Sequence, residues 1–294
     1  MANRVMTHRL WRCGVIVGAC MLAAGLDRAP ASAQAADAAP CVAAATAKPL
    51  ADLREASGAA LSRRTPGLLW SHNDSGQPLL YAVDAATGAV RGRVRVANAT
   101  VVDWEDVSLA TCPGGTCIYI ADIGDNRLER RSITIYRIPE PQPQDPDSTR
   151  AEVFTAVYPD GRHDAEALFV TGDGVYIVTK DVASAVYRVP KPLRPGVNMT
   201  LERVAELPLK HVTDAETSVD GKWVAIRTNQ EIGFYRTADI GRGAPHGINV
   251  SVRALKEPQG EGVALDGQNV YLTGEGSRTG TLNVLRCTLP STTS

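Results

Sequence analysis

The chain has 294 residues and almost no net charge, with 31 basic residues against 32 acidic ones. No basic tract interrupts this balance, which argues against a nucleic-acid or anionic-membrane partner bound through a positively charged face. The length that remains after an N-terminal leader is enough for one large domain with a substantial hydrophobic core.

The first residues are typical of a secretory signal peptide. Three arginines precede an apolar run, which ends in the small-residue sequence APASAQA. This order predicts a signal peptide over residues 1–33, cleaved after Ala33, and a flexible leader over residues 34–40. Lipoprotein anchoring at Cys20 is a less favoured alternative. Because the apolar run is too short to span a membrane, we expect no integral membrane segment in the mature chain and a secreted or periplasmic location.

Four cysteines remain in the predicted mature chain, and they allow three pairings. Cys112 and Cys117 flank the tight turn PGGT, so they can meet across a hairpin, which leaves Cys41 to pair with Cys287. A zinc site built from all four would need other spacings. The exported location therefore favours two disulfides.

Two phrases recur through the chain at intervals of about 50 residues. In the first, a glutamate begins a short apolar run, as in DWEDVSL and DAEALFV, and a tyrosine-containing phrase such as VYRVP follows about two dozen residues later. The glutamates of the first phrase are predicted to be equivalent; they are Glu55, Glu105, Glu166, Glu216 and Glu261. A repeat of this length, filled with short strands and turns, predicts a β-propeller with one four-stranded blade per repeat.

Taken in chain order, apolar alternation and turn residues predict nineteen strands in five blades. The predicted strands are 57–62, 67–72, 79–84 and 89–97 in blade one; 106–111, 117–122, 132–139 and 151–159 in blade two; 166–171, 174–180, 185–190 and 200–209 in blade three; 216–220, 222–228, 232–237 and 248–256 in blade four; and 262–266, 269–275 and 282–289 in blade five. The Pro-rich segment 140–149 is predicted to be a surface loop in blade two.

Blade five lacks a fourth strand, and an open edge would leave backbone donors and acceptors unpaired. Residues 42–53 are available to fill it, which would place Cys41 beside Cys287 where the ring closes. The predicted fold is therefore an all-β, five-bladed β-propeller of four-stranded antiparallel blades, closed by an N-terminal strand. It forms a single domain over residues 41–294.

The connections that enter each blade and the turns between its second and third strands share one face of a propeller. The five glutamates are therefore predicted to converge on one mouth of the central channel. Candidate groups for chemistry at this mouth are Glu105, Asp106 and His163 as proton-transfer residues. Lys180 and Arg227 could neutralise an anionic substrate.

Five carboxylates around a narrow axis need compensating positive charge, because like charges raise one another's pKa. Oxygen ligands without convergent thiols favour Ca²⁺, held by the five glutamates. Two alternatives stay open. Lys180 and Arg227 could supply the charge, or each glutamate could accept backbone hydrogen bonds from the neighbouring blade and fix its register.

A glutamate at the start of each inner strand resembles the pattern of a broad group of secreted propellers that includes gluconolactonase-like, phytase-like and NHL-type proteins. The five-blade count with acidic channel residues is similar to calcium-activated nucleotidases of the apyrase type. That resemblance implies Ca²⁺ bound in the channel at the five glutamates named above. In the apyrase type, serines are mixed among the glutamates, whereas the repeated phrase here contains glutamate in all five copies.

These features lead to two expectations about function. The first is an exported propeller with an acidic, calcium-binding channel that acts as a ligand-binding or scaffold protein of the cell envelope. The second is a metal-dependent hydrolase of a phosphoester, ester or lactone that uses the same mouth. A small anionic or polar ligand fits both, and whether the protein is an enzyme stays open.

Overall fold

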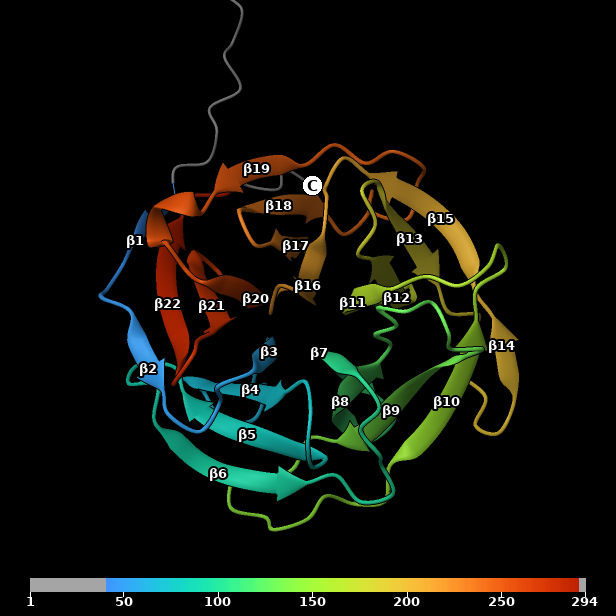
Figure 1. Ribbon diagram of the computed structural model, residues 1–294, viewed down its shortest axis with the longest axis horizontal. Coiled ribbons are helices and arrows are strands. Elements are labelled where there is room, and N and C mark those ends of the chain that lie inside the picture. The colour runs from blue at the N-terminus through green and yellow to red at the C-terminus, as the bar shows by residue number, and fades with distance from the viewer. Residues whose placement is uncertain (1–40, 291–294) are drawn as a thin grey trace, which may run out of the picture. The chain divides into compact units, whose positions relative to one another are not determined.

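The structure, a computed structural model, describes residues 41–290. The predicted signal peptide, cleavage site and leader, together with Cys20, lie outside the described residues. Figure 1 shows five β-sheets arranged as blades around a common centre, which confirms the predicted five-bladed β-propeller. The one helical element among the described residues is the three-residue 3-10 helix η1, Arg253–Leu255. No helix in residues 41–290 is long and apolar enough to cross a membrane.

Each blade places its first strand next to the channel. The inner strands are β3 (Ala56–Leu61), β7 (Trp104–Cys112), β11 (Ala165–Thr171), β16 (Val212–Thr217) and β20 (Gln259–Asp266). The second strands are β4 (Leu68–Asn73), β8 (Gly115–Asp122), β12 (Gly174–Thr179), β17 (Trp223–Thr228) and β21 (Asn269–Glu275).

The third and fourth strands complete the blades toward the outside. The third strands are β5 (Leu79–Asp84), β9 (Ile133–Pro139), β13 (Ser184–Arg188), β18 (Glu231–Arg236) and β22 (Gly280–Cys287). The fourth strands of blades one to four are β6 (Val90–Arg95), β10 (Glu152–Val157), β15 (Glu202–Leu207) and β19 (Ile248–Ser251). Side chains of β3 and β16 are buried throughout, whereas β19 alternates between half-buried and exposed, as expected for inner and outer strands.

The N-terminal segment closes the ring as predicted. It supplies two short strands, β1 (Cys41–Ala43) and β2 (Lys48–Leu50), which both pair antiparallel with β22 of blade five. Cys41 pairs directly with Cys287, and the two form a disulfide. The second predicted disulfide, Cys112–Cys117, is also present, across the β7–β8 hairpin.

Three connections between third and fourth strands reach back over the outer strand of the preceding blade. In the Pro-rich loop of blade two, Asp147 forms a parallel bridge with Arg95 of β6. The strand β14 (Asn198–Thr200) pairs in parallel with β10, and Gly243 forms a parallel bridge with Ala205 of β15. These loops occupy backbone groups of outer strands that would otherwise form open sheet edges.

The hydrophobic core is divided among the blade junctions. Five clusters of buried residues each join the facing sides of two neighbouring blades. Trp70 of blade one and Trp104 of blade two are both fully buried in one of these clusters. Burial between blades therefore holds the ring rigid around the channel, which fixes the positions of the residues that line it.

Candidate functional site

Each inner strand carries a β-bulge near its N-terminal end. The pairing of β7 with β8 skips Glu105, and that of β11 with β12 skips Glu166. The same irregularity lies between Val212 and Asp214 in β16, and corresponding ones occur in β3 and β20. Because a bulge adds an unpaired residue and re-aims side chains, the five bulges identify which residues of the repeats are equivalent.

The residues at the bulges form one ring at the mouth, which we call the bulge ring. Its members are Ser57, Glu105, Glu166, Thr213 and Glu261. The predicted equivalence of five glutamates is therefore wrong for two of them. Glu55 precedes β3, and Glu216 lies near the end of β16. A glutamate beside an apolar run does not specify a bulge, since a bulge is a property of strand pairing.

The two hydroxyl members of the bulge ring make the same contact at two blade junctions. Ser57 Oγ donates a hydrogen bond to the backbone oxygen of Glu105 at 2.6 Å, and Thr213 Oγ1 donates to that of Glu261 at 3.0 Å. These matching contacts support the alignment of the blades. The two hydroxyl groups bind the backbone of the glutamates and do not contact their carboxylates.

Glu55 belongs to an outer rim two residues before the bulge ring. Counted from the bulges, the rim residues are Glu55, Asp103, Asp164, His211 and Gln259. Ser75 Oγ donates a hydrogen bond to Glu55 Oε2 at 2.6 Å. Burial, together with the charges of Glu55 and Glu275, raises the pKa of Asp74 to about 6. The rim is therefore acidic on the side of blades one, two and three, which carry Glu55, Asp103 and Asp164.

Lys180, the first residue after β12, supplies positive charge within this acidic mouth. Its Nζ forms an ion pair with the carboxylate of Glu166. Burial by itself would lower the pKa of Lys180, but the charges of Glu166, Glu261 and Glu105 raise it overall. Lys180 thus lies among the mouth carboxylates, and its role toward an anionic substrate stays a prediction.

The bulge ring contains three carboxyl groups, and the pKa of each is raised above its ordinary value. Burial raises the pKa of Glu166 to about 7, against the lowering effect of Lys180. Burial and then the charge of Glu166 raise the pKa of Glu261 to about 8. Burial, followed by the charges of Glu166 and Asp103, raises the pKa of Glu105 well above its usual range. Near neutral pH the ring therefore binds protons or another cation.

Gly124 permits a close approach of backbone to two of the mouth carboxylates. A Cβ atom at this position would collide with Glu105 Oε1 and with the carboxylate of Asp103. Gly124 comes from the sequence DIGDN, which by itself reads as an ordinary turn. In the folded protein a larger residue at position 124 would displace the carboxylate oxygens of Glu105 and Asp103, so the site requires glycine here.

Directly below the bulge ring, Asp106 and Asp214 join all five inner strands. Asp106 on β7 accepts hydrogen bonds through Oδ2 from backbone N–H groups of β11 and β16, at 2.6 and 3.4 Å. Asp214 on β16 accepts through Oδ2 from backbone N–H groups of β3 and β20, at 3.2 and 2.5 Å. Inner strands have no further strand to pair with on the channel side, so these carboxyls satisfy donors that would otherwise be unpaired.

Asp106 lies below the mouth, where it is buried together with Asp214. Both side chains are fully buried. Burial and the charge of Asp214 raise the pKa of Asp106 well above its usual range, and burial raises that of Asp214 to about 7. The prediction that Asp106 transfers protons at the mouth is therefore wrong. The matching aspartates appear when Thr213 rather than Glu216 is aligned with Glu105.

Glu216 lies deeper in the channel and acts as a latch between blades. Its carboxylate accepts hydrogen bonds from Ser108 Oγ at 2.5 Å and from the backbone N–H of Leu109 at 3.3 Å. Arg63 Nη2 lies 3.8 Å from the carboxylate. The prediction that Glu216 binds a metal ion at the mouth is therefore wrong. The alternative stated above, a glutamate that accepts hydrogen bonds from another blade and fixes its register, describes this residue.

Arg227 is also a structural residue. Its guanidinium is fully buried, donates to the backbone oxygens of Gly262 and Thr273 at 2.7 and 2.6 Å, and forms an ion pair with Glu257. It therefore links blade four to blade five. The prediction that Arg227 neutralises a substrate at the mouth is wrong, because its side chain has no exposed surface.

His163 is held by protein groups on both ring nitrogens. Nδ1 lies 3.2 Å from Asp181 Oδ2, and Nε2 lies 3.1 Å from both Asp160 Oδ1 and the hydroxyl oxygen of Tyr187. The rings of Tyr158 and Tyr187 pack against the imidazole. These contacts describe a satisfied hydrogen-bonding cluster, and the role of His163 in proton transfer stays a prediction.

The donor set of the mouth fits a hard cation in its chemistry. In residues 41–290, no three His, Cys, Asp or Glu side chains already stand in the arrangement of a metal centre. The ion pair between Lys180 and Glu166 occupies part of the bulge ring instead. All remaining donors of the ring are carboxylate or hydroxyl oxygens, which Ca²⁺ prefers.

Comparisons with known proteins support the fold and do not identify a family. No protein-family model and no curated protein matches the chain. Among solved structures, the Malassezia sympodialis allergen Mala s 1 has a TM-score of 0.50 at 10% identity, with 81% of this chain and 93% of that chain covered. A luciferin-regenerating enzyme has a TM-score of 0.44 at 12% identity, with 82% and 95% covered.

The PQQ domain of pyranose dehydrogenase from Coprinopsis cinerea has a TM-score of 0.45 at 10% identity, with 84% of this chain and 97% of that domain covered. At such low identity a structural likeness concerns the fold alone. None of these three names a gluconolactonase, a phytase or an apyrase, so the finer resemblance stays a prediction. What is shown for this chain is a β-propeller, built from five blades and closed by a disulfide-linked N-terminal segment.

Proposed function

We propose that this protein is an exported β-propeller that binds Ca²⁺ with the carboxylates of the bulge ring and uses the ion in a ligand-binding site at the channel mouth. The observation that carries the proposal is the charge imbalance of the ring. Three buried glutamates, Glu105, Glu166 and Glu261, surround the single ammonium group of Lys180. A divalent cation with oxygen ligands would relieve their mutual repulsion.

The mouth carboxylates also have unused hydrogen-bonding capacity. Within residues 41–290, the carboxylate of Glu105 accepts no hydrogen bond, and that of Glu166 contacts only Lys180. Asp103 and Asp164 on the rim add further oxygen donors close to Glu105, since both charges raise its pKa. The mixture of hydroxyls and glutamates in the bulge ring is the pattern that the sequence resemblance associates with calcium-binding propellers of the apyrase type.

Export is supported by covalent chemistry. Both disulfides link cysteines of the described domain, and such bonds persist in oxidising compartments outside the cytoplasm. Free Ca²⁺ is available at millimolar concentration in many such environments, which suits sites of modest affinity. The proposed location is therefore secreted or periplasmic.

The proposal is tested by titrating Ca²⁺ into the EGTA-treated, oxidised protein, by calorimetry and by thermal unfolding. We expect one bound Ca²⁺ and a rise in the melting temperature, because the ion binds the folded state alone. The double variant Glu105→Gln with Glu166→Gln should lose both effects. Glu216→Gln is the matched control, since this glutamate is already engaged by Ser108 and Leu109.

Two outcomes would overturn the calcium site. The first is the absence of any binding heat and of any shift in melting temperature at about 10 mM Ca²⁺. This concentration is roughly tenfold above the dissociation constant of the weakest extracellular calcium-binding modules. The second is unchanged binding in the double variant. Replacing Lys180 with Met should strengthen binding, because the ammonium group competes with the ion for Glu166.

A hydrolase that uses the same mouth is the second candidate. It is favoured by the rim carboxyl groups of Asp103 and Asp164, which lie close to Glu105 and add possible proton-transfer groups beside the proposed ion. Calcium-dependent turnover of p-nitrophenyl phosphate, p-nitrophenyl acetate or a lactone, abolished by Glu105→Gln, would support it. Calcium binding without turnover of any of these would leave a ligand-binding propeller.

A further inference from the structure

A cavity of about 600 Å³ opens beside the bulge ring, between blades three, four and five. We call it the mouth pocket. The residues of its lining on which the argument depends are Lys180, Lys210, His211, Asn229, Arg253 and Glu261. Its volume lies in the range of small-molecule sites. Because Lys180 and Glu261 also belong to the mouth, the pocket is continuous with the proposed calcium site.

Two cations at the edge of the mouth pocket have no acidic partner. Lys210 and Arg253 are exposed, and no salt bridge joins either of them to an acidic group within residues 41–290. Some exposed basic residues, such as Arg91 and Arg188, do form such pairs, whereas others among the described residues, such as Arg278, do not. What sets Lys210 and Arg253 apart is their place in the lining of a cavity. The unpaired charges of the pocket are therefore free to meet a ligand.

Basic groups outnumber acidic ones in the lining of the mouth pocket. The basic residues are Lys180, Lys210 and Arg253, and the acidic residues are Glu231 and Glu261. The lining therefore carries a small excess of positive charge, to which the exposed side chains of Lys210 and Arg253 contribute.

Polar side chains of the pocket are held in place from below. Asn229 Oδ1 accepts a hydrogen bond from the backbone N–H of Gly260 at 2.8 Å, a bond that uses the amide oxygen and not its NH₂ group. Thr213 and Thr228 are buried in the floor and bound to backbone groups. Fixed amide and hydroxyl groups suit a ligand that carries hydroxyls.

The two connections that line the pocket have unusual backbone conformations. His211 (φ 55°), before β16, and Lys256 (φ 53°), before β20, are two of the four non-glycine residues with positive φ in residues 41–290. His211 is stabilised there by a hydrogen bond from its N–H to the backbone oxygen of Asp181 at 3.2 Å. Such conformations carry a cost of about 1 kcal/mol or more and collect at binding sites.

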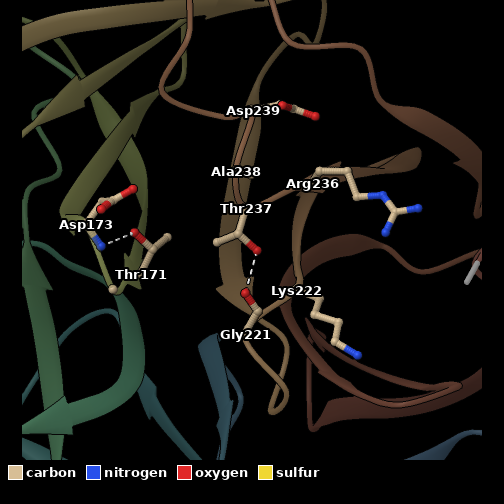
Figure 2. A pocket seen from close by; sticks show the side chains of 9 residues that line it. Thr171, Asp173, Gly221, Lys222, Arg236, Thr237, Ala238 and Asp239 are labelled. Atoms are coloured by element: carbon tan, nitrogen blue, oxygen red, sulfur yellow. Dashed lines mark hydrogen bonds between the residues drawn. The ribbon is translucent and has the colours of Figure 1, made fainter. Parts of the chain in front are cut away.

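A second cavity on the opposite face lacks these features. It has about 660 Å³ and is lined by Asp173, Lys222, Arg236 and Asp239 among others. Lys222 is paired with Asp220 at 3.6 Å, and Arg236 stacks over Trp223. In Figure 2 the charged side chains of this cavity point in different directions and do not converge. It provides a control surface of similar size.

We propose that the mouth pocket binds a small hydroxylated anion, whose carboxylate or phosphate group is held by Lys210 and Arg253 and whose hydroxyls contact Asn229 and Glu261. This names the ligand class of the proposed function, and it depends on that function only for the use of the same mouth. Lys210 and Arg253 lie on the connections before and after blade four, and Lys180 lies on blade three. In the proposed binding mode the anionic group therefore lies on the blade-four side and the body of the ligand extends toward Lys180 and the bulge ring.

The test uses three probes of one size on the oxidised protein: gluconate, glucose 6-phosphate and uncharged glucose. Calorimetric titrations are run at low and at physiological salt, each with EGTA and with Ca²⁺. We expect at least one anion to bind and glucose not to bind. Lys210→Ala and Arg253→Ala should each weaken binding about tenfold, as expected for loss of one charge-assisted contact, and salt should weaken it further. Lys222→Ala, in the opposite cavity, is the matched control.

The titrations with EGTA and with Ca²⁺ distinguish anion binding in the mouth pocket from calcium binding at the bulge ring. Anion binding that needs Lys210 and Arg253 but persists in EGTA supports the pocket even where no calcium binds. Preference for gluconate or for glucose 6-phosphate identifies the acidic group. Calcium binding without anion binding, equal binding of glucose, or unchanged binding in both Lys210→Ala and Arg253→Ala would overturn the inference and leave the proposed function in place.

Discussion

The channel contains two sets of buried carboxyl groups that look alike in sequence and differ in their surroundings. In the deep set, Asp106, Asp214 and Glu216 accept hydrogen bonds from backbone N–H groups or hydroxyls of other blades. In the mouth set, Glu105 accepts none among the described residues, and Glu166 contacts only Lys180. Both sets have raised pKa values because of burial.

The difference shows that burial of an acid is not by itself a sign of function. Each deep aspartate binds the open inner edges of the strands through one oxygen atom, Oδ2, while its buried Oδ1 has no hydrogen-bond partner among the described residues. Glu105 and Glu166 lie at the bulges and accept no hydrogen bond from a backbone N–H group among the described residues. A carboxylate that holds no backbone donor and lies beside an ammonium group is what distinguishes the candidate binding site from a structural latch.

The largest expected effect comes from removing one deep carboxyl. Asp106→Ala leaves backbone N–H groups of β11 and β16 without an acceptor, and should lower the free energy of unfolding by about 3 kcal/mol, since each buried unpaired donor costs about 1 to 3 kcal/mol. Asp106→Asn retains an acceptor oxygen and should stay within about 1 kcal/mol of the wild type. Chemical denaturation of both variants measures this. Equal losses would show that the charge, and not the acceptor, matters.

An intermediate effect is expected at Gly124. In Gly124→Ala the new methyl group collides with the carboxylates of Glu105 and Asp103, so Ca²⁺ affinity should fall at least about tenfold while the fold survives. Gly172→Ala is the control, because a Cβ atom there meets nothing within 4 Å. Calcium titration of both variants decides the matter. Wild-type affinity in Gly124→Ala would remove this edge of the mouth from the proposed site.

The smallest effect is a pH dependence of stability in the absence of Ca²⁺. Glu261 has a folded-state pKa of about 8 against an ordinary 4.5, so over that interval the folded state binds more protons than the unfolded chain. The contribution of this residue to stability is therefore complete below about pH 4.5 and is lost as the pH rises toward 8. Thermal unfolding in EGTA should show the melting temperature falling from pH 5 to pH 8. Glu261→Gln should flatten this slope, and an unchanged slope would assign it to other groups.

Much of the fold could be predicted from the sequence. The repeated phrases identified five blades, and Cys41 and Cys287 marked where the ring closes, because a four-stranded repeat with one missing strand has few ways to be completed. The site was predicted less completely. Glu105, Glu166, Glu261 and Lys180 lie at the mouth, whereas Glu216, Asp106 and Arg227 are structural, and Ser57, Thr213 and Gly124 had been missed.

The sequence by itself determined the period, the blade count, the closure and the pairing of cysteines, since these follow from local alternation and from spacing along the chain. Only the tertiary structure decided which acids meet at the mouth. A bulge shifts the register by one residue, and a shift of one or two residues moves a side chain between the rim, the ring and the buried core of the channel. Strand pairing fixes that shift, and the pattern of glutamates along the chain does not encode it.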